Sequence, residues 1–160
     1  MPQEIDPDSM PRREMLLKAL EEFEPFESLL DIGCGFGEDL KLIEHKFGVT
    51  GWGIEPDTDK TEGIEHFKIV NQHATILQNK IFKDNSIDII ISNAAIMYID
   101  WPGGALKEMY RICRKGIVMV EQVSDYMDHA LGDYHAEKIK TDFGGGNEWD
   151  NRGYLIKIRK

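Results

Sequence analysis

The chain has 160 residues, a length that suits one domain with a single substantial core, so we expect one domain over residues 1–160. Its 19 basic and 29 acidic residues give a formal charge of −10, which disfavours nucleic acid as a partner. No apolar run approaches the roughly 20 residues of a membrane span, and the first ten residues lack a signal-peptide pattern. Cys34 and Cys113 form neither a disulfide framework nor a metal motif. We therefore expect a cytoplasmic protein with reduced thiols, no metal site and no membrane partner.

Strand and helix patterns alternate along the chain. Short apolar runs predict the strands, in chain order 27–34, 49–55, 66–72, 87–93, 116–122 and 154–160. Apolar residues at helical spacing predict the helices, in chain order 6–23, 37–47, 74–81, 102–116 and 125–139. This order favours an α/β fold, a doubly wound and mostly parallel sheet with helices on both faces. Such sheets bind ligands at the carboxyl ends of their strands, where the strand order reverses.

The stretch LLDIGCGFGEDL, residues 29–40, joins a strand to a helix through three glycines. Gly33, Gly35 and Gly37 would let the main chain approach a ligand closely, and a helix N-terminus offers free N–H groups and a partial positive charge. A dinucleotide fingerprint would require glycine at the position of Glu38. A carboxylate there would repel a pyrophosphate, so a nicotinamide-dependent oxidoreductase is disfavoured but stays open as an alternative.

Two acidic residues at strand ends describe the expected ligand further. Asp31 lies inside the strand end, where a buried carboxylate needs a cationic partner, and an ammonium group of an amino acid would serve. Glu55 ends the second strand, where an acid accepts hydrogen bonds from both hydroxyls of a ribose. The expected ligand therefore has an amino-acid end and a ribose with no phosphate between them. S-adenosylmethionine fits this description.

Four stretches resemble, in this order, the motifs of class I S-adenosylmethionine-dependent methyltransferases: LLDIGCGFGEDL, GWGIEPD, NSIDIIISNAAIMYI and ALKEMYRICRKGIVMVE. The resemblance implies a Rossmann-like methyltransferase fold, S-adenosyl-L-methionine as cofactor and methyl transfer as the activity. It also implies a set of cofactor-binding residues: Asp31 on the amino group, Gly33, Cys34 and Gly35 by backbone contact, Glu55 on the ribose, Pro56 against the adenine and Asn93 beside the sulfonium.

The sequence departs from that family in two places. His73, followed by Ala74, stands where the family usually has an acidic residue for the adenine amino group. We include both in the expected cofactor site, because a neutral imidazole accepts one hydrogen bond or stacks. Only residues 123–160 follow the fifth strand, which is short for the usual helix–strand–helix–strand ending. We therefore expect a shortened C-terminal part in which one terminal strand is missing.

The acceptor side of the site has weaker signals. Tyr98 and Asp100 after the fourth strand are candidate catalytic groups, although an ordinary loop explains them equally well. His129, on a predicted helix, is a further candidate, for which a solvated surface position is the better explanation. The stretch SNAAI lacks the Asn-Pro-Pro-Tyr of enzymes that methylate amino groups of nucleobases or glutamine, which favours a small-molecule or sugar-like acceptor. We expect the segment 124–153, with Trp149, to cover the acceptor. A non-catalytic S-adenosylmethionine-binding domain is the second alternative.

Overall fold

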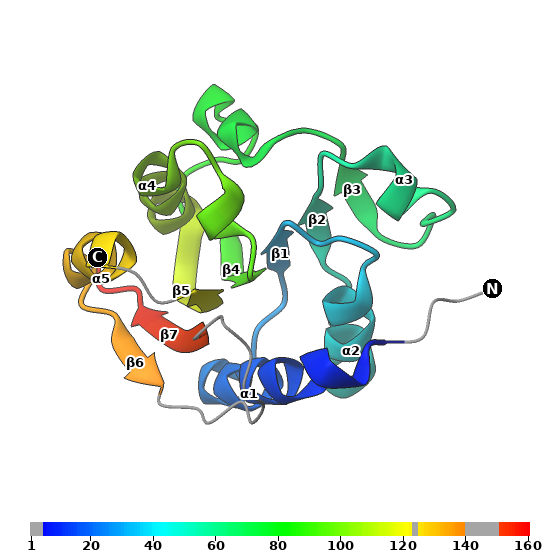
Figure 1. Ribbon diagram of the computed structural model, residues 1–160, viewed down its shortest axis with the longest axis horizontal. Helices are drawn as coiled ribbons and strands as arrows, with labels where there is room; N and C mark the ends of the chain where they lie inside the picture. The colour runs from blue at the N-terminus through cyan, green and yellow to red at the C-terminus, as the bar shows by residue number, and fades with distance from the viewer. Residues whose placement is uncertain (1–4, 123–124, 140–150) are drawn as a thin grey trace.

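The structure is a computed structural model that describes residues 5–122, 125–139 and 151–160. Within these ranges one sheet has seven strands in the order β3-β2-β1-β4-β5-β7-β6 (Figure 1). The strands are β1 Leu29–Ile32, β2 Trp52–Ile54, β3 Lys68–Val70, β4 Ile87–Asn93, β5 Cys113–Gln122, β6 Glu137–Ile139 and β7 Asn151–Lys157. The first five strands pair in parallel, and β7 runs antiparallel between β5 and β6. The sheet is therefore mostly parallel, as predicted.

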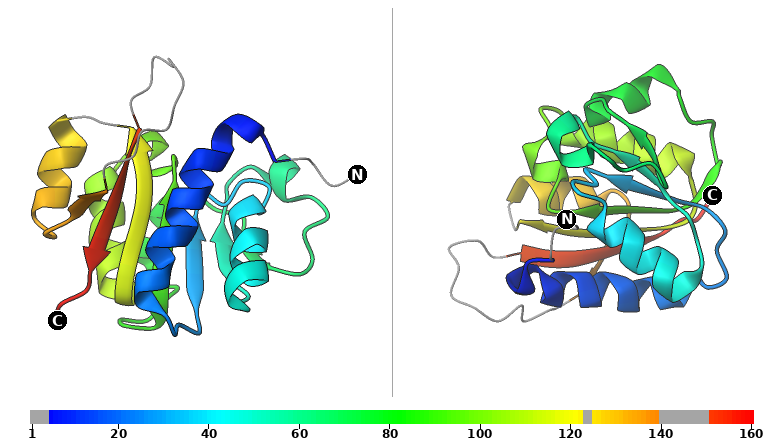
Figure 2. Two further views of the ribbon diagram at one scale, coloured as in Figure 1. Left: turned by 90° about the horizontal axis from the view of Figure 1, so that it is seen from below. Right: turned by 90° about the vertical axis from the view of Figure 1, so that its right-hand side faces the viewer.

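Helices cover both faces of this sheet (Figure 2). The α-helices are α1 Met10–Leu20, α2 Glu38–Phe47, α3 Thr58–Thr61, α4 Pro102–Ile112 and α5 Asp125–Gly132. The 3-10 helices are η1 Pro7–Ser9, η2 Glu21–Phe23, η3 Ala74–Asn79 and η4 Ile96–Tyr98. The helices α1 and α2 lie on one face, and α4 lies on the other. The predicted doubly wound arrangement is confirmed.

The isoleucine run of β4 shows why this sheet needs two helical layers. Ile89 and Ile91 are fully buried in the cluster that contains Leu16, Leu20 and Leu40 of α1 and α2. Ile90, between them, is fully buried in the cluster on the opposite face, with residues of α4 and α5. A strand that is buried on both faces has no polar side, which explains an apolar run without alternation.

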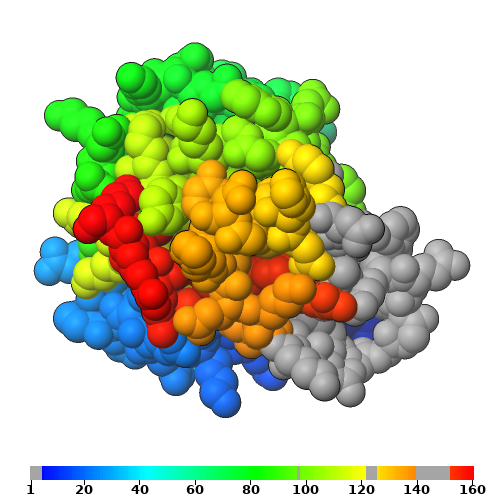
Figure 3. All heavy atoms as spheres, turned by 90° about the vertical axis from the view of Figure 1, so that its left-hand side faces the viewer, coloured from blue at the N-terminus to red at the C-terminus, as the bar shows by residue number. Residues whose placement is uncertain are grey.

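The C-terminal part differs from the sequence-based expectation. The helix predicted over 125–139 ends at Gly132, and the chain then forms β6, in which Lys138 pairs with Tyr154 of β7. Both terminal strands are present, so the prediction of a missing strand is wrong. Figure 3 shows α5 and β6 beside β7 at this end of the molecule. The strand β6 has only three residues, two of them charged, so its sequence gives no strand pattern. An edge strand tolerates such residues, and β6 forms because it pairs with β7.

The boundary between α4 and β5 also differs. The sequence predicted one helix as far as residue 116, but α4 ends at Ile112 and β5 begins at Cys113, which pairs with Ile87. The strand β5 pairs with β4 from its first residue, although the register shifts between Ile87 and Ile89. Pairing with the neighbouring strand therefore overrides the local helical pattern of the basic residues 114–115.

Candidate functional site

A cavity of about 620 Å³ opens where β1, β2 and β4 end. Its walls come from the glycine loop after β1, the end of β2, the start of η3, the loop after β4 and the first turn of α1. The strand β1 has β2 on one side and β4 on the other, so the chain order of the sheet reverses here. The cavity therefore lies at the switch point at which doubly wound sheets bind ligands.

The glycine loop has a backbone that side chains would strain. Gly33, Gly35 and Gly37 have φ angles of +73°, +54° and +78°, in the left-handed region that favours glycine. A Cβ atom on Gly33 would lie 2.4 Å from the Cβ of Ala95. No atom lies within 4 Å of a Cβ built on Gly35, which lines the cavity. The glycines therefore shape the turn, bring two loops together and leave the main chain open to a ligand.

Glu55 connects the end of β2 to this loop. Its side chain lines the cavity although the residue is only 6% exposed. One carboxylate oxygen accepts a hydrogen bond from the N–H of Gly35 at 3.0 Å, and the other accepts one from the N–H of Asp57 at 3.0 Å. Each oxygen of a carboxylate has a further lone pair. Glu55 is therefore fixed in place and still able to accept two hydroxyl groups.

Asp31 is buried at the end of β1 with no hydrogen-bond partner for either carboxylate oxygen. Its burial, together with the negative charge of Asp39, raises the pKa of the carboxyl well above its usual range, and the charge of Arg13 opposes this shift. Its own side chain is not part of the cavity wall, although its neighbours Ile32 and Gly33 are. An unpaired buried carboxylate is costly, so this position favours a cationic group.

A second unpaired oxygen belongs to Asn93 at the end of β4. The Nδ2 of Asn93 donates to Asp39 at 3.1 Å, and Asp39 forms an ion pair with Arg13 at 2.6 Å. The Oδ1 of Asn93 is buried and has no donor. Asn93 and Asp39 both line the cavity. The ends of β1 and β4 thus offer unused acceptors that match an ammonium group.

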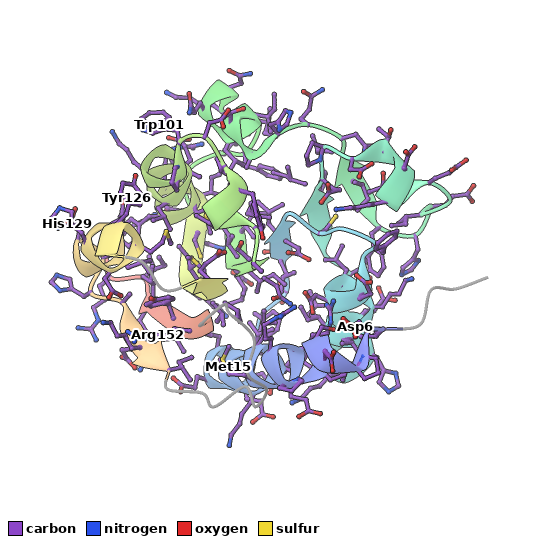
Figure 4. The ribbon with its side chains drawn as sticks, viewed as in Figure 1. Asp6, Met15, Trp101, Tyr126, His129 and Arg152 are labelled. Atoms are coloured by element: carbon purple, nitrogen blue, oxygen red, sulfur yellow. The ribbon has the colours of Figure 1, made fainter. Side chains whose placement is uncertain are left out.

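The other sequence-predicted residues divide into two groups. Those in the cavity wall are Gly33, Cys34, Gly35, Pro56, His73, Ala74, Tyr98 and Asp100. His129 is not part of the wall, and Figure 4 shows it on α5 at the outside of the molecule. Trp149 and the glycines 144–146 lie outside the described residues, so the expected cover over the acceptor stays a prediction.

Cys34 has the environment of a packing residue. A Cβ atom on Gly53 would lie 2.5 Å from the Cys34 sulfur, so the thiol fills the space above that glycine. Burial raises the pKa of the Cys34 thiol, and the nearby carboxylates raise it further. A thiol that stays protonated is a poor nucleophile.

Sequence reasoning missed Arg12, Arg13 and Asp39 in the cavity wall, and Glu121, which lies outside the wall but supports one of its loops. Arg12 and Arg13 reach the cavity from α1, which no local motif connects to the glycine loop. Glu121 is fully buried at the end of β5, and one of its oxygens accepts hydrogen bonds from the Ser92 hydroxyl at 3.0 Å and the Ile96 N–H at 3.1 Å. This carboxylate fixes the loop that carries Ala95 to Gly33. An isolated acid at a strand end gave no signal of that role.

Residues 10–153 match the methyltransferase-domain family. Over 151 residues the chain is 26% identical to trans-aconitate 2-methyltransferase of Deinococcus radiodurans, covering 88% of this chain and 55% of that protein. Over 95 residues it is 28% identical to phosphatidylethanolamine N-methyltransferase of Cereibacter sphaeroides, covering 55% of this chain and 46% of that protein. A SAM-dependent methyltransferase from Aquifex aeolicus has a similar structure, with a TM-score of 0.66 at 18% identity over 96% of this chain and 94% of that one.

The chain therefore belongs to the methyltransferase-domain family, and its sheet is that of the class I S-adenosylmethionine-dependent methyltransferases. It spans about half the length of the curated relatives it matches. S-adenosylmethionine is the cofactor of this class. The site fits that cofactor through the fixed carboxylate of Glu55 and the unpaired oxygens of Asp31 and Asn93.

Within the described ranges, no helix combines the length and the apolar character that crossing a membrane requires. The same ranges contain no group of three or more histidine, cysteine, aspartate or glutamate side chains placed to hold a metal ion.

Proposed function

We propose that this protein transfers the methyl group of S-adenosylmethionine to a small-molecule acceptor, with sugar-like molecules included. One observation carries the proposal. At the switch point of the sheet, one cavity brings together a fixed carboxylate, Glu55, and the unpaired buried oxygen of Asn93, and the unpaired carboxylate of Asp31 lies on the adjoining strand β1. These groups suit a ligand that has a ribose at one end and an ammonium group at the other.

Each part of the cavity has a proposed role toward the cofactor. Glu55 accepts the ribose hydroxyls, while Asp31 and Asn93 hold the ammonium group. Pro56, His73 and Ala74 line the same cavity and border the adenine. When bound, the cofactor supplies an electrophilic methyl group on a sulfonium whose leaving thioether is neutral. The protein then has to orient the acceptor and keep water away from the methyl group.

The loop after β4 is proposed to orient the acceptor. Tyr98 and Asp100 lie in the cavity wall, and Tyr98 is 80% exposed, so an acceptor can reach its hydroxyl from solvent. A proton released by a hydroxyl or ammonium acceptor would pass to the Asp100 carboxylate or to water. Glu121 keeps this loop in place without touching the acceptor.

Two observations support a small acceptor. The formal charge of −10 disfavours a nucleic acid. One relative is named for methylation of trans-aconitate, a small carboxylic acid. Against the nicotinamide alternative, Glu38 lines the cavity at the start of α2, where a pyrophosphate would have to bind.

The test is transfer of a labelled methyl group from S-adenosylmethionine to a panel of small carboxylates, amines, phenols and sugars. We expect at least one acceptor to be methylated, with lower activity in Asp100→Asn and full activity in His129→Gln. Binding of the cofactor without transfer to any acceptor would instead support the non-catalytic alternative. Absence of both binding and transfer would refute the proposal.

A further inference from the structure

Arg12 lines the cavity but has no partner for its charge among the residues that the structure describes. It lies in the first turn of α1 and is partly buried. Its Nε atom is buried and has no hydrogen-bond acceptor. A guanidinium group has five N–H donors, and a buried donor without an acceptor destabilises the protein. An anion at this position would accept the unpaired hydrogen bonds and neutralise the charge of Arg12.

The neighbouring arginine shows what a completed site looks like. Arg13 forms an ion pair with Asp39 at 2.6 Å and lies 3.9 Å from Glu38, and its Nε donates to the Ser9 hydroxyl at 3.0 Å. Both arginines line the same cavity, but the carboxylates of α2 are paired with Arg13. The guanidinium group of Arg12 is therefore available to a ligand in the cavity.

The electrostatics of α1 strengthen this contrast. The first turn of a helix has a partial positive charge, so a cation there is disfavoured unless an anion lies close to it. Arg13 has such an anion in Asp39, whereas Arg12 has none within the described part of the chain. The planar guanidinium group is suited to a carboxylate, which it can bind through two parallel hydrogen bonds.

We propose that Arg12 binds a carboxylate of a ligand in this cavity. The inference deepens the proposed function and rests on it, because both ligands of that function can supply the group. One source is the carboxylate at the amino-acid end of the cofactor, and the other is a carboxylate on the methyl acceptor. The cavity wall holds the carboxylates of Glu38, Asp39, Glu55 and Asp100 and the cations of Arg12, Arg13 and Lys60, and Arg13 is already paired with Asp39. In either case Arg12 offsets the repulsion between these carboxylates and the carboxylate of the ligand.

The experiment compares the full chain with Arg12→Gln, Arg12→Lys and, as a control, Arg159→Gln, an exposed arginine outside the cavity. Calorimetry measures binding of S-adenosylhomocysteine and of 5′-methylthioadenosine, which lacks the amino-acid end. A second series measures binding of citrate, succinate and benzoate with and without S-adenosylhomocysteine. Far-ultraviolet circular dichroism confirms that each variant is folded.

Loss of a charged hydrogen bond should weaken binding of the matching ligand about ten- to a hundredfold. If Arg12→Gln weakens S-adenosylhomocysteine but not 5′-methylthioadenosine, the cofactor supplies the carboxylate. If it weakens only one of the free carboxylates, the acceptor supplies it. In both cases Arg12→Lys should bind more tightly than Arg12→Gln, and Arg159→Gln should match the unmodified protein.

The inference is overturned if Arg12→Gln binds every one of these compounds as the unmodified protein does, or if its effect extends equally to 5′-methylthioadenosine. This failure differs from a failure of the proposed function, in which the unmodified protein binds neither adenosyl compound. In that case the carboxylate series still tests Arg12, and the absence of binding in that series would overturn the inference as well.

Discussion

At Asp31, burial and the charge of Asp39 raise the pKa of a carboxyl that has no hydrogen-bond donor. Because the folded protein holds this proton more tightly than the unfolded chain does, stability falls as pH rises above the ordinary aspartate value of about 3.9. A carboxylate that is costly to the free protein is useful only when a cation binds beside it. Stability and binding are therefore opposed at this residue.

We predict that Asp31→Asn stabilises the ligand-free protein more at pH 7 than at pH 4, because the amide cannot ionise whereas the buried carboxyl is driven to ionise as the pH rises. The same change should weaken S-adenosylhomocysteine binding at least tenfold. Urea unfolding at the two pH values and calorimetry measure these effects. A stability difference that is the same at both pH values would contradict the account of Asp31.

We predict that Glu55→Gln weakens S-adenosylhomocysteine binding by about 1–3 kcal/mol, because the amide nitrogen cannot accept a hydrogen bond. The loss has two origins, the ribose hydroxyls and the N–H of Gly35 that Glu55 now fixes. Glu65→Gln, at an exposed position outside the cavity, is the matched control. Equal dissociation constants for Glu55→Gln and the control would mean that Glu55 serves the loop alone.

Among the elements, the loop after β4 depends on β5. Glu121 accepts hydrogen bonds from Ser92 and Ile96, and the N–H of Ala94 donates to Val120 at 2.6 Å. These contacts hold Ala94 at a φ of +55°, a conformation that is uncommon for residues other than glycine. Hydrogen bonds to β5 therefore stabilise the conformation of this loop.

We predict that Glu121→Ala lowers the free energy of unfolding by roughly 1–3 kcal/mol for each buried donor that it leaves without an acceptor. Ser92→Ala should lower it less, because this change removes the hydroxyl itself and leaves no unpaired donor behind. Hydrogen exchange should speed up at the amides of residues 95–99 in Glu121→Ala. Unchanged exchange there would show that the loop holds its conformation without this carboxylate.

The sequence predicts an element well when a local pattern specifies it, and poorly when contacts between distant residues do. The glycine loop and the isoleucine run are local signals. The first correctly predicted the end of β1 and a cavity beside it, and the second correctly predicted β4. The strand β6 exists only because Lys138 pairs with Tyr154, and Arg12 reaches the cavity only because Leu16 and Leu20 dock α1 on the sheet. Such contacts join distant parts of the chain and leave no local pattern.

For the whole molecule, one cavity links the first turn of α1 to the loops after β1, β2 and β4. A ligand that fills it contacts segments far apart in the sequence, so binding should stabilise the entire fold. At a concentration one hundred times the dissociation constant the gain is about 2.7 kcal/mol. The match covers only 55% of one curated relative and 46% of the other, so the acceptor is the part of the function that they inform least.

The most direct test of the central claim is a calorimetric titration of the protein with S-adenosylhomocysteine and, separately, with NAD. We predict that S-adenosylhomocysteine binds one-to-one and that NAD does not bind, because Glu38 lines the cavity where a pyrophosphate would lie. Binding of NAD with no binding of S-adenosylhomocysteine would contradict the account.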